Sequence, residues 1–158
     1  MIEKRILYHD SRDIIKYPEI RKQKYNKDFY FGFYCILIKE QAERWATRYG
    51  NTGIINEYLY TPKSNLHILS FSTMTEEWLD FIVSCRSGKS HKYDIVEEPM
   101  ADDKIFNYIQ NFIDGEISRA AFWELAKFRK PTHQISFNTQ ESLKEIKFLK
   151  SYEVVCYD

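Results

Sequence analysis

The sequence contains few of the residues that cross-link or interrupt a chain. Its 158 residues include 3 cysteines, 5 glycines and 4 prolines. Cys35, Cys85 and Cys156 are far apart, odd in number and outside any Cys-x-x-Cys pair, so we expect a reduced, cytoplasmic protein rather than a disulfide scaffold. The glycines and prolines are scattered, with no repeat, low-complexity tract or linker. We therefore expect one domain over residues 1–158.

Net charge and long apolar runs are also absent. The 23 Lys and Arg residues balance the 23 Asp and Glu residues, which argues against a protein that holds nucleic acid mainly by bulk charge. No window approaches the run of about 18 apolar residues that a membrane helix needs, so we expect no membrane partner. The charge is nevertheless uneven. Residues 1–27 hold eight basic against four acidic side chains, and residues 94–103 hold five acidic side chains and no basic one.

The apolar patterns predict an α+β fold, in which strands are separated by helices of modest length. Strands are expected where β-branched and aromatic residues cluster or alternate with polar ones. These segments are 5–9, 28–37, 54–60, 66–71, 93–96, 134–137 and 153–157. Residues 10–28 are polar and contain Pro18, which predicts a loop or a helix fragment.

Helices are expected where apolar residues recur three and four positions apart. The first expected helix runs from Lys39 to Gly50, the second covers 73–85 behind a Thr73–Glu76 capping box, the third covers 102–115, and the fourth starts at Ser118. A short helix is expected from Thr139. The expected buried faces are Ala42, Trp45, Ala46 and Tyr49; Trp78, Phe81, Ile82 and Cys85; Ile105, Ile109, Phe112 and Ile113; and Ala121, Phe122, Leu125 and Phe128.

Several common functional motifs are missing. Gly50 and Gly53 are too isolated to form a phosphate-binding loop, and no His or Cys set has the spacing of a zinc site. No serine lies in a nucleophile elbow. The acidic residues of 94–103 are hard oxygen ligands, but their order matches no known metal cage, so we expect a solvated loop and a helix cap there, with no metal.

Three short segments at strand ends stand out. They are Leu7-Tyr8-His9-Asp10-Ser11, then Phe31-Gly32-Phe33-Tyr34-Cys35 with Trp45 eleven residues after Tyr34, and Thr132-His133-Gln134-Ile135-Ser136-Phe137. Together they resemble the ADP-ribosyltransferase superfamily of the diphtheria-toxin and poly(ADP-ribose) polymerase type. That superfamily carries His, Tyr and Glu at the corresponding places. Nearly the whole chain also resembles a bacterial family known only as a domain of unknown function, through segments 78–82, 93–103 and 133–137.

The first resemblance implies a split β-sheet core with flanking helices and NAD as co-substrate. Tyr34 and Trp45 would stack on the nicotinamide, a role that suits aromatic rings facing a cationic ring. His9 would hold a ribose hydroxyl, and Asp10 and Ser11 would lie at the carboxamide. Gly32 would allow close approach of the ligand or of neighbouring backbone. By the same resemblance, His9, Tyr34 and Gln134 would form the catalytic set.

Two departures from that pattern shape the expected function. Asp10 stands where the superfamily has a glycine, and Gln134 stands where it has the catalytic glutamate, so a dipole replaces a charge. Glutamate is associated with polymer elongation, so we expect a mono-ADP-ribosyltransferase, toxin-like or defensive, with an unknown macromolecular acceptor and an inhibitor protein as partners. The alternatives are a degenerate module that binds NAD, ADP-ribose or a nucleic-acid end, and a protein-interaction module. In the simplest alternative Tyr34 and Trp45 are core residues.

Overall fold

The computed structural model describes residues 3–20, 32–48, 50, 52–63, 65–100, 103–129 and 132–156. These residues form an α+β fold. Its elements, in chain order, are β1 (Arg5–Ser11), β2 (Phe33–Ile36), α1 (Lys39–Ala46), β3 (Thr52–Tyr60), β4 (Ile68–Ser70), α2 (Glu76–Arg86), β5 (Ile95–Met100), α3 (Asp103–Ile113), α4 (Arg119–Ala126), β6 (Thr132–Phe137), α5 (Gln140–Leu143) and β7 (Ile146–Val155).

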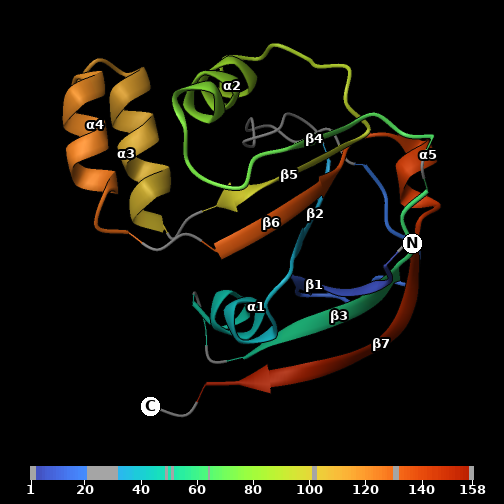
Figure 1. Ribbon diagram of the computed structural model, residues 1–158. Helices are drawn as coiled ribbons and strands as arrows, with labels where there is room; N and C mark the ends of the chain where they lie inside the picture. Colours follow the sequence, from blue (N-terminus) through green and yellow to red (C-terminus); the bar gives the residue numbers. More distant parts are fainter. Residues whose placement is uncertain are drawn as a thin grey trace.

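All seven strands belong to one mixed sheet in the order β4-β5-β6-β2-β1-β3-β7. The pair β4–β5 is parallel and the other neighbours are antiparallel. Figure 1 shows β4, β5 and β6 grouped at one end of the sheet and β1, β3 and β7 at the other, with β2 running between the two groups. Since β1 and β2 share a single register pair, Tyr8 with Ile36, the two halves are joined there by very little regular pairing.

Three clusters of buried side chains cover the two faces of this sheet. The sheet-interior cluster is Leu7, Phe33, Cys35, Tyr58, Tyr60, Ile95, Ile135, Phe137 and Ile146. The α2–α4 cluster is Trp78, Leu79, Ile82, Val96, Ile105, Ile109, Phe122 and Ala126. The α1 cluster is Ile36, Ala42 and Ile55, with Tyr8 and Trp45 packed against it. Figure 1 shows α3 and α4 side by side at one end of the molecule. Among the described residues, no helix combines the length and hydropathy that crossing a bilayer requires.

The predicted strands are found, with shifted ends. Within the predicted strand 28–37 the structure has β2 over Phe33–Ile36, and residues 28–31 lie outside the described part of the chain. The strand predicted at 93–96 instead runs over 95–100, straight through the acidic segment, so the expectation of a solvated loop there was wrong. The last strand, predicted at 153–157, begins at Ile146 and pairs along β3. Long-range pairing, rather than local composition, sets these ends.

Each of the predicted helices is found among the described residues, and the helices differ from the prediction in their ends and caps. The cap of α2 is Thr75, whose side chain accepts a hydrogen bond from the Trp78 amide, so the predicted Thr73–Glu76 capping box was wrong. Ser118 caps α4 as predicted. Gly115, with φ of +77°, follows the end of α3, as glycine does in left-handed backbone. The expected caps and faces at Asp102 and Tyr49 lie outside the described residues.

The predicted buried face of the fourth helix was partly wrong. Phe122 is fully buried, but Leu125 is 41% and Phe128 81% exposed, and Ala126 takes the inner position. The helix ends at Ala126, so Phe128 lies in the following turn and does not continue the apolar stripe. The period of 3.6 residues predicts a buried face only as far as the helix extends.

Candidate functional site

The three segments that carry the predicted site residues lie side by side in the sheet. His9 is on β1, Tyr34 on β2 and Gln134 on β6, and these strands are consecutive in the order β6-β2-β1. Their sequence separation is large, so the sheet topology, and not local structure, brings them together. This centre of the sheet is the first part of the candidate site.

His9 connects two of these strands through its side chain. Its Nδ1 atom lies 2.6 Å from the main-chain carbonyl oxygen of Tyr34. Its ring stacks on Phe33, with ring centroids 4.2 Å apart and an interplanar angle of 26°. Phe33 belongs to the sheet-interior cluster, so the His9 ring lies on that side of the sheet. The imidazole is half-buried and is held in one orientation by both contacts.

Tyr34 and Gln134 share the opposite face. Across the β2–β6 ladder Tyr34 lies opposite Ser136, and Ile36 lies opposite Gln134. Residues opposite one another, and those two apart, project to the same side of a sheet. Tyr34 packs against the α2–α4 cluster and is half-buried. The structure therefore brings Tyr34 and Gln134 together on one face and places the His9 side chain on the other.

Gly32 has a role in chain packing. A Cβ atom built on it would lie 2.5 Å from Ser136 Oγ and 2.7 Å from Asn138 Nδ2. Real Cβ atoms do not approach other heavy atoms so closely, so glycine is what allows the start of β2 to approach the end of β6. We expected Gly32 to admit ligand or neighbouring backbone, and the close neighbours here belong to the chain itself.

Trp45 and Tyr34 have different packing neighbours. Trp45 packs against the α1 cluster, and the Arg48 guanidinium lies over its ring at 4.1 Å from the centroid. Tyr34 packs against the α2–α4 cluster instead. The two rings thus pack against different clusters, and the predicted stacking of both on a nicotinamide stays a prediction.

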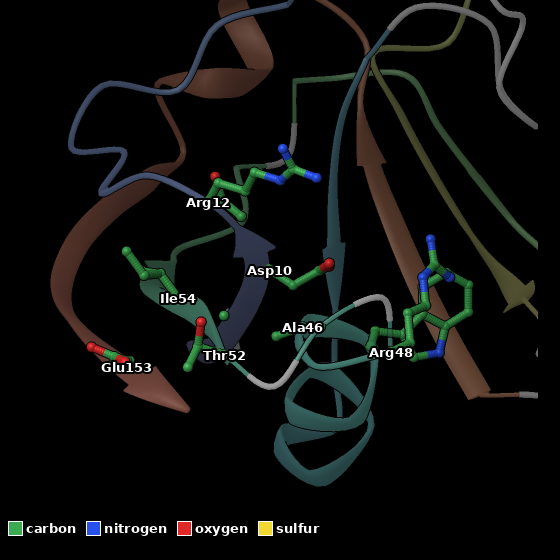
Figure 2. A pocket seen from close by; sticks show the side chains of 11 residues that line it. Asp10, Arg12, Ala46, Arg48, Thr52, Ile54 and Glu153 are labelled. Atoms are coloured by element: carbon green, nitrogen blue, oxygen red, sulfur yellow. The ribbon is translucent and has the colours of Figure 1, made fainter. Parts of the chain in front are cut away.

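A hollow of about 510 Å³ opens beside Trp45 and is the second part of the candidate site. Its walls come from the end of β1, the end of α1, the start of β3 and the end of β7. The lining residues are Asp10, Ser11, Arg12, Trp45, Ala46, Arg48, Gly50, Thr52, Gly53, Ile54 and Glu153. Figure 2 shows Arg12 and Arg48 on opposite sides of this hollow, with Asp10 between them. Three of the predicted cofactor-binding residues therefore line the same hollow: Asp10, Ser11 and Trp45.

Arg12, Arg48 and Glu153 were not among the predicted site residues. Arg12 follows the predicted strand by three residues, and Arg48 is three residues after Trp45, a spacing that places side chains near each other at a helix end. That spacing from Trp45 was the sequence feature that could have identified Arg48 as a site residue. Glu153 reaches the hollow through the β3–β7 pairing, in which it lies opposite Ile54, and no local pattern predicts that pairing.

Cys35 lies on β2, next to Tyr34, and its thiol is unreactive. Burial raises the pKa of the Cys35 thiol well above its ordinary value, and the Asp10 carboxylate raises it further. Cys35 is fully buried in the sheet-interior cluster. The thiol is therefore protonated at neutral pH and does not supply a thiolate nucleophile.

The acidic segment is used for internal contacts. Asp94 accepts hydrogen bonds from the Thr139 hydroxyl at 2.7 Å and the His67 amide at 2.9 Å. The two carboxylate oxygens of Glu97 lie 2.9 and 3.4 Å from the Arg5 guanidinium. Glu98 accepts from the Trp78 indole N–H. Within the described ranges, no group of three or more His, Cys, Asp or Glu side chains is arranged to hold a metal ion.

Comparison with known proteins places the chain in a family. Residues 5–148 match the family described as "Protein of unknown function (DUF3990)". No curated protein matches the chain significantly. The match covers β1 to the first part of β7 and includes all the site residues discussed except Glu153, so the expected likeness to a family of unknown function is confirmed. The chain belongs to the DUF3990 family.

Proposed function

We propose that this protein is an NAD-dependent mono-ADP-ribosyltransferase acting on a macromolecular acceptor. One observation carries the proposal. The strands bearing His9, Tyr34 and Gln134 are consecutive in the sheet, and the His9 imidazole contacts the main chain of Tyr34 itself. A phenol ring and a carboxamide thus lie on one face of β2 and β6, and the imidazole, on the other face, holds the main chain of β2 at Tyr34.

The reaction would break the bond between the ribose C1′ atom and the nicotinamide nitrogen. The bonding electron pair leaves on nicotinamide, and the ribose passes through an oxocarbenium-like state. An acceptor nucleophile then forms a bond to C1′ and releases its proton to solvent. Groups that stabilise positive charge near C1′ and hold the ribose lower the barrier of this step.

Each residue has a part that its position supports. Gln134 would direct its carboxamide oxygen at the ribose, and Tyr34, on the same face, would stack on the nicotinamide. Because Tyr34 and Trp45 pack against different clusters, we assign stacking to Tyr34 first. The hollow lined by Trp45, Arg12 and Arg48 would receive the pyrophosphate part, since guanidinium groups suit phosphate oxygens.

Gln134 limits the expected rate. Loss of one preorganised electrostatic contact typically costs about 2.7–4 kcal/mol, or a factor on the order of 10²–10³. Transfer of a single ADP-ribose unit tolerates the loss of this electrostatic contact better than processive synthesis of an ADP-ribose polymer does. The proposal is therefore slow single transfer.

A second candidate rests on the same residue. Without a carboxylate at position 134, the protein would bind NAD or ADP-ribose and not turn it over. In that case the hollow at Asp10, Arg12 and Trp45 would still bind the ligand, and nicotinamide would not be released.

The test combines binding with turnover. Purified protein is titrated with NAD by calorimetry and incubated with labelled NAD and cell lysate, with nicotinamide release measured in parallel. The proposal expects binding, transfer and release, all reduced in Tyr34→Leu and Gln134→Ala. The matched control is Gln140→Ala, because Gln140 is exposed on α5. Binding without release supports the second candidate, and absence of both rejects the two together.

A further inference from the structure

Glu98 is a fully buried carboxylate on β5, which lies between β4 and β6 in the sheet. Its exposed fraction is 0%, and its Oε2 atom accepts a hydrogen bond from the indole N–H of Trp78. Burying a carboxylate costs free energy unless hydrogen bonds compensate for lost water. A glutamine of the same shape would accept the indole N–H equally well. The contact with Trp78 therefore explains an acceptor at this position but does not require its charge.

The sheet register sets Glu98 beside Gln134. In the antiparallel β5–β6 ladder, Glu98 lies directly opposite Gln134, and the next pair along the same face is Val96 with Ser136. Opposed residues project to one face with Cβ atoms about 4.5–5.5 Å apart, close enough for two long polar side chains to meet. Trp78 and Val96 belong to the α2–α4 cluster, against which Tyr34 also packs. Glu98, Gln134 and Tyr34 thus lie on the same face of the sheet.

The two side chains differ in access. Gln134 is half-buried, so a ligand can reach it, whereas Glu98 is closed off from solvent. Glu98 can therefore influence a ligand only through another residue. Gln134 ends in an amide with two N–H donors and one carbonyl acceptor on a side chain with three rotatable bonds. The fixed Glu98 carboxylate would therefore determine whether the N–H groups or the carbonyl oxygen of the Gln134 amide faces the ligand.

We propose that Glu98 is the positioning residue of Gln134. From its place opposite Gln134 in the ladder, its carboxylate would accept a hydrogen bond from the Gln134 amide N–H, and this bond would turn the Gln134 carbonyl oxygen toward the ligand. A charged acceptor polarises the amide and makes that oxygen more negative. Glu98 then supplies, through Gln134, the negative charge that a glutamate at position 134 would have supplied directly. The catalytic consequence rests on the proposed transferase function, whereas the orientation of Gln134 does not.

The first measurement does not depend on activity. The side-chain amide signals of Gln134 are recorded by nuclear magnetic resonance in 15N-labelled protein, without and with NAD, and assigned with Gln134→Ala. Glu98→Gln should shift these signals and speed the exchange of the amide protons with water. Glu97→Gln is the matched control, because Glu97 is adjacent on β5 but pairs with Arg5 on the opposite face. Trp78→Phe removes the indole donor and keeps Glu98, so it tests whether Trp78 alone accounts for the effect.

The second measurement is kinetic. Glu98→Gln should lower kcat for nicotinamide release about 10- to 100-fold, the range expected when a hydrogen bond to a charged group is lost, with little change in the KM for NAD. If Glu98→Gln does not fold, a scalar coupling across the hydrogen bond, from the Gln134 amide nitrogen to the Glu98 carboxyl carbon, is sought in the wild-type protein.

The outcomes separate the two proposals. Gln134 signals that are unchanged in Glu98→Gln, both with and without NAD, overturn the positioning role. If that variant does not fold, absence of the coupling in both states overturns it instead. A shifted signal with unchanged kcat supports the orientation and rejects its catalytic consequence. A wild-type protein without turnover removes the transferase proposal, while the signals still decide the orientation of Gln134.

Discussion

The Nδ1 atom of His9 lies 2.6 Å from the carbonyl oxygen of Tyr34. A carbonyl can only accept, so Nδ1 carries a proton, and in the neutral ring Nε2 is then the acceptor. The same ring stacks on Phe33. Because β1 and β2 share only the Tyr8–Ile36 register pair, this side chain helps to join two strands where their regular pairing is minimal. A ligand-binding role for His9 would use Nε2.

His9→Ala should therefore lower stability. The variant loses one hydrogen bond and one stacked ring pair, and each is worth about 0.5–1.5 kcal/mol, so we expect a loss of about 1–3 kcal/mol. The measurement is the free energy of unfolding in urea. The control is His67→Ala, whose side chain is exposed and which should stay within about 0.5 kcal/mol of wild type. Equal stability of the two variants would contradict a structural role for the His9 ring.

The cap of α2 gives a test in which two nearby threonines differ. The Thr75 hydroxyl accepts the Trp78 amide at 3.2 Å, and Thr73 is an exposed residue two positions earlier. Thr75→Ala should cost about 1 kcal/mol, the usual value of a lost N-cap. Thr73→Ala should cost little. Urea unfolding measures both, and a larger loss in Thr73→Ala would restore the capping box predicted from sequence.

The sequence predicted what depends on local pattern. The alternation of Ile135 and Phe137 with polar neighbours predicted a strand, and both residues lie fully buried on β6. Ser118 predicted a helix start because its side chain can satisfy a free amide of the first turn. Such features depend on residues within one or two helical turns, and they were predicted to within a few residues.

What depends on strand pairing could not be predicted. Glu98 and Gln134 are 36 positions apart in the sequence and become neighbours only because β5 pairs with β6. Whether Tyr34 and Trp45 face each other depends on how β2 and α1 pack, and the structure sends them to different clusters. A one-residue change of register would move a side chain to the other face. Sequence reasoning therefore identified the candidate residues without their mutual geometry.

Gly53 and Gly50 offer a matched pair beside the hollow. A Cβ atom on Gly53 would lie 2.8 Å from both the carbonyl carbon and the Cβ atom of Ala46, and closer still to its oxygen. Because the clash is with the backbone of α1, Gly53→Ala should cost about 1–3 kcal/mol by overpacking. A Cβ atom on Gly50 meets nothing within 4 Å, so Gly50→Ala should be nearly neutral. The midpoints of urea unfolding compare them, and a neutral Gly53→Ala would mean that α1 can move away from β3.

Glu145 predicts a pH dependence whose sign follows from its environment. It is 4% exposed in the turn before β7, and its Oε1 atom accepts the Lys63 amide at 2.5 Å. Burial raises the pKa of this carboxyl above its ordinary value of 4.5, although the Lys63 hydrogen bond opposes the shift. The folded protein therefore holds the proton to higher pH than the unfolded chain. Between the two pKa values the unfolded chain binds fewer protons, so this group lowers stability as pH rises.

Glu145→Gln removes that titration and keeps an acceptor for the Lys63 amide. Its stability relative to wild type should therefore be greater at pH 7 than at pH 4, whatever the constant effect of the new amide group. Urea unfolding at pH 4, 5, 6 and 7 gives this difference directly. Glu116→Gln, at an exposed position between α3 and α4, controls for the change in net charge. A difference that stays constant with pH, or falls as pH rises, would show that the buried Glu145 carboxyl is not destabilised in its charged form.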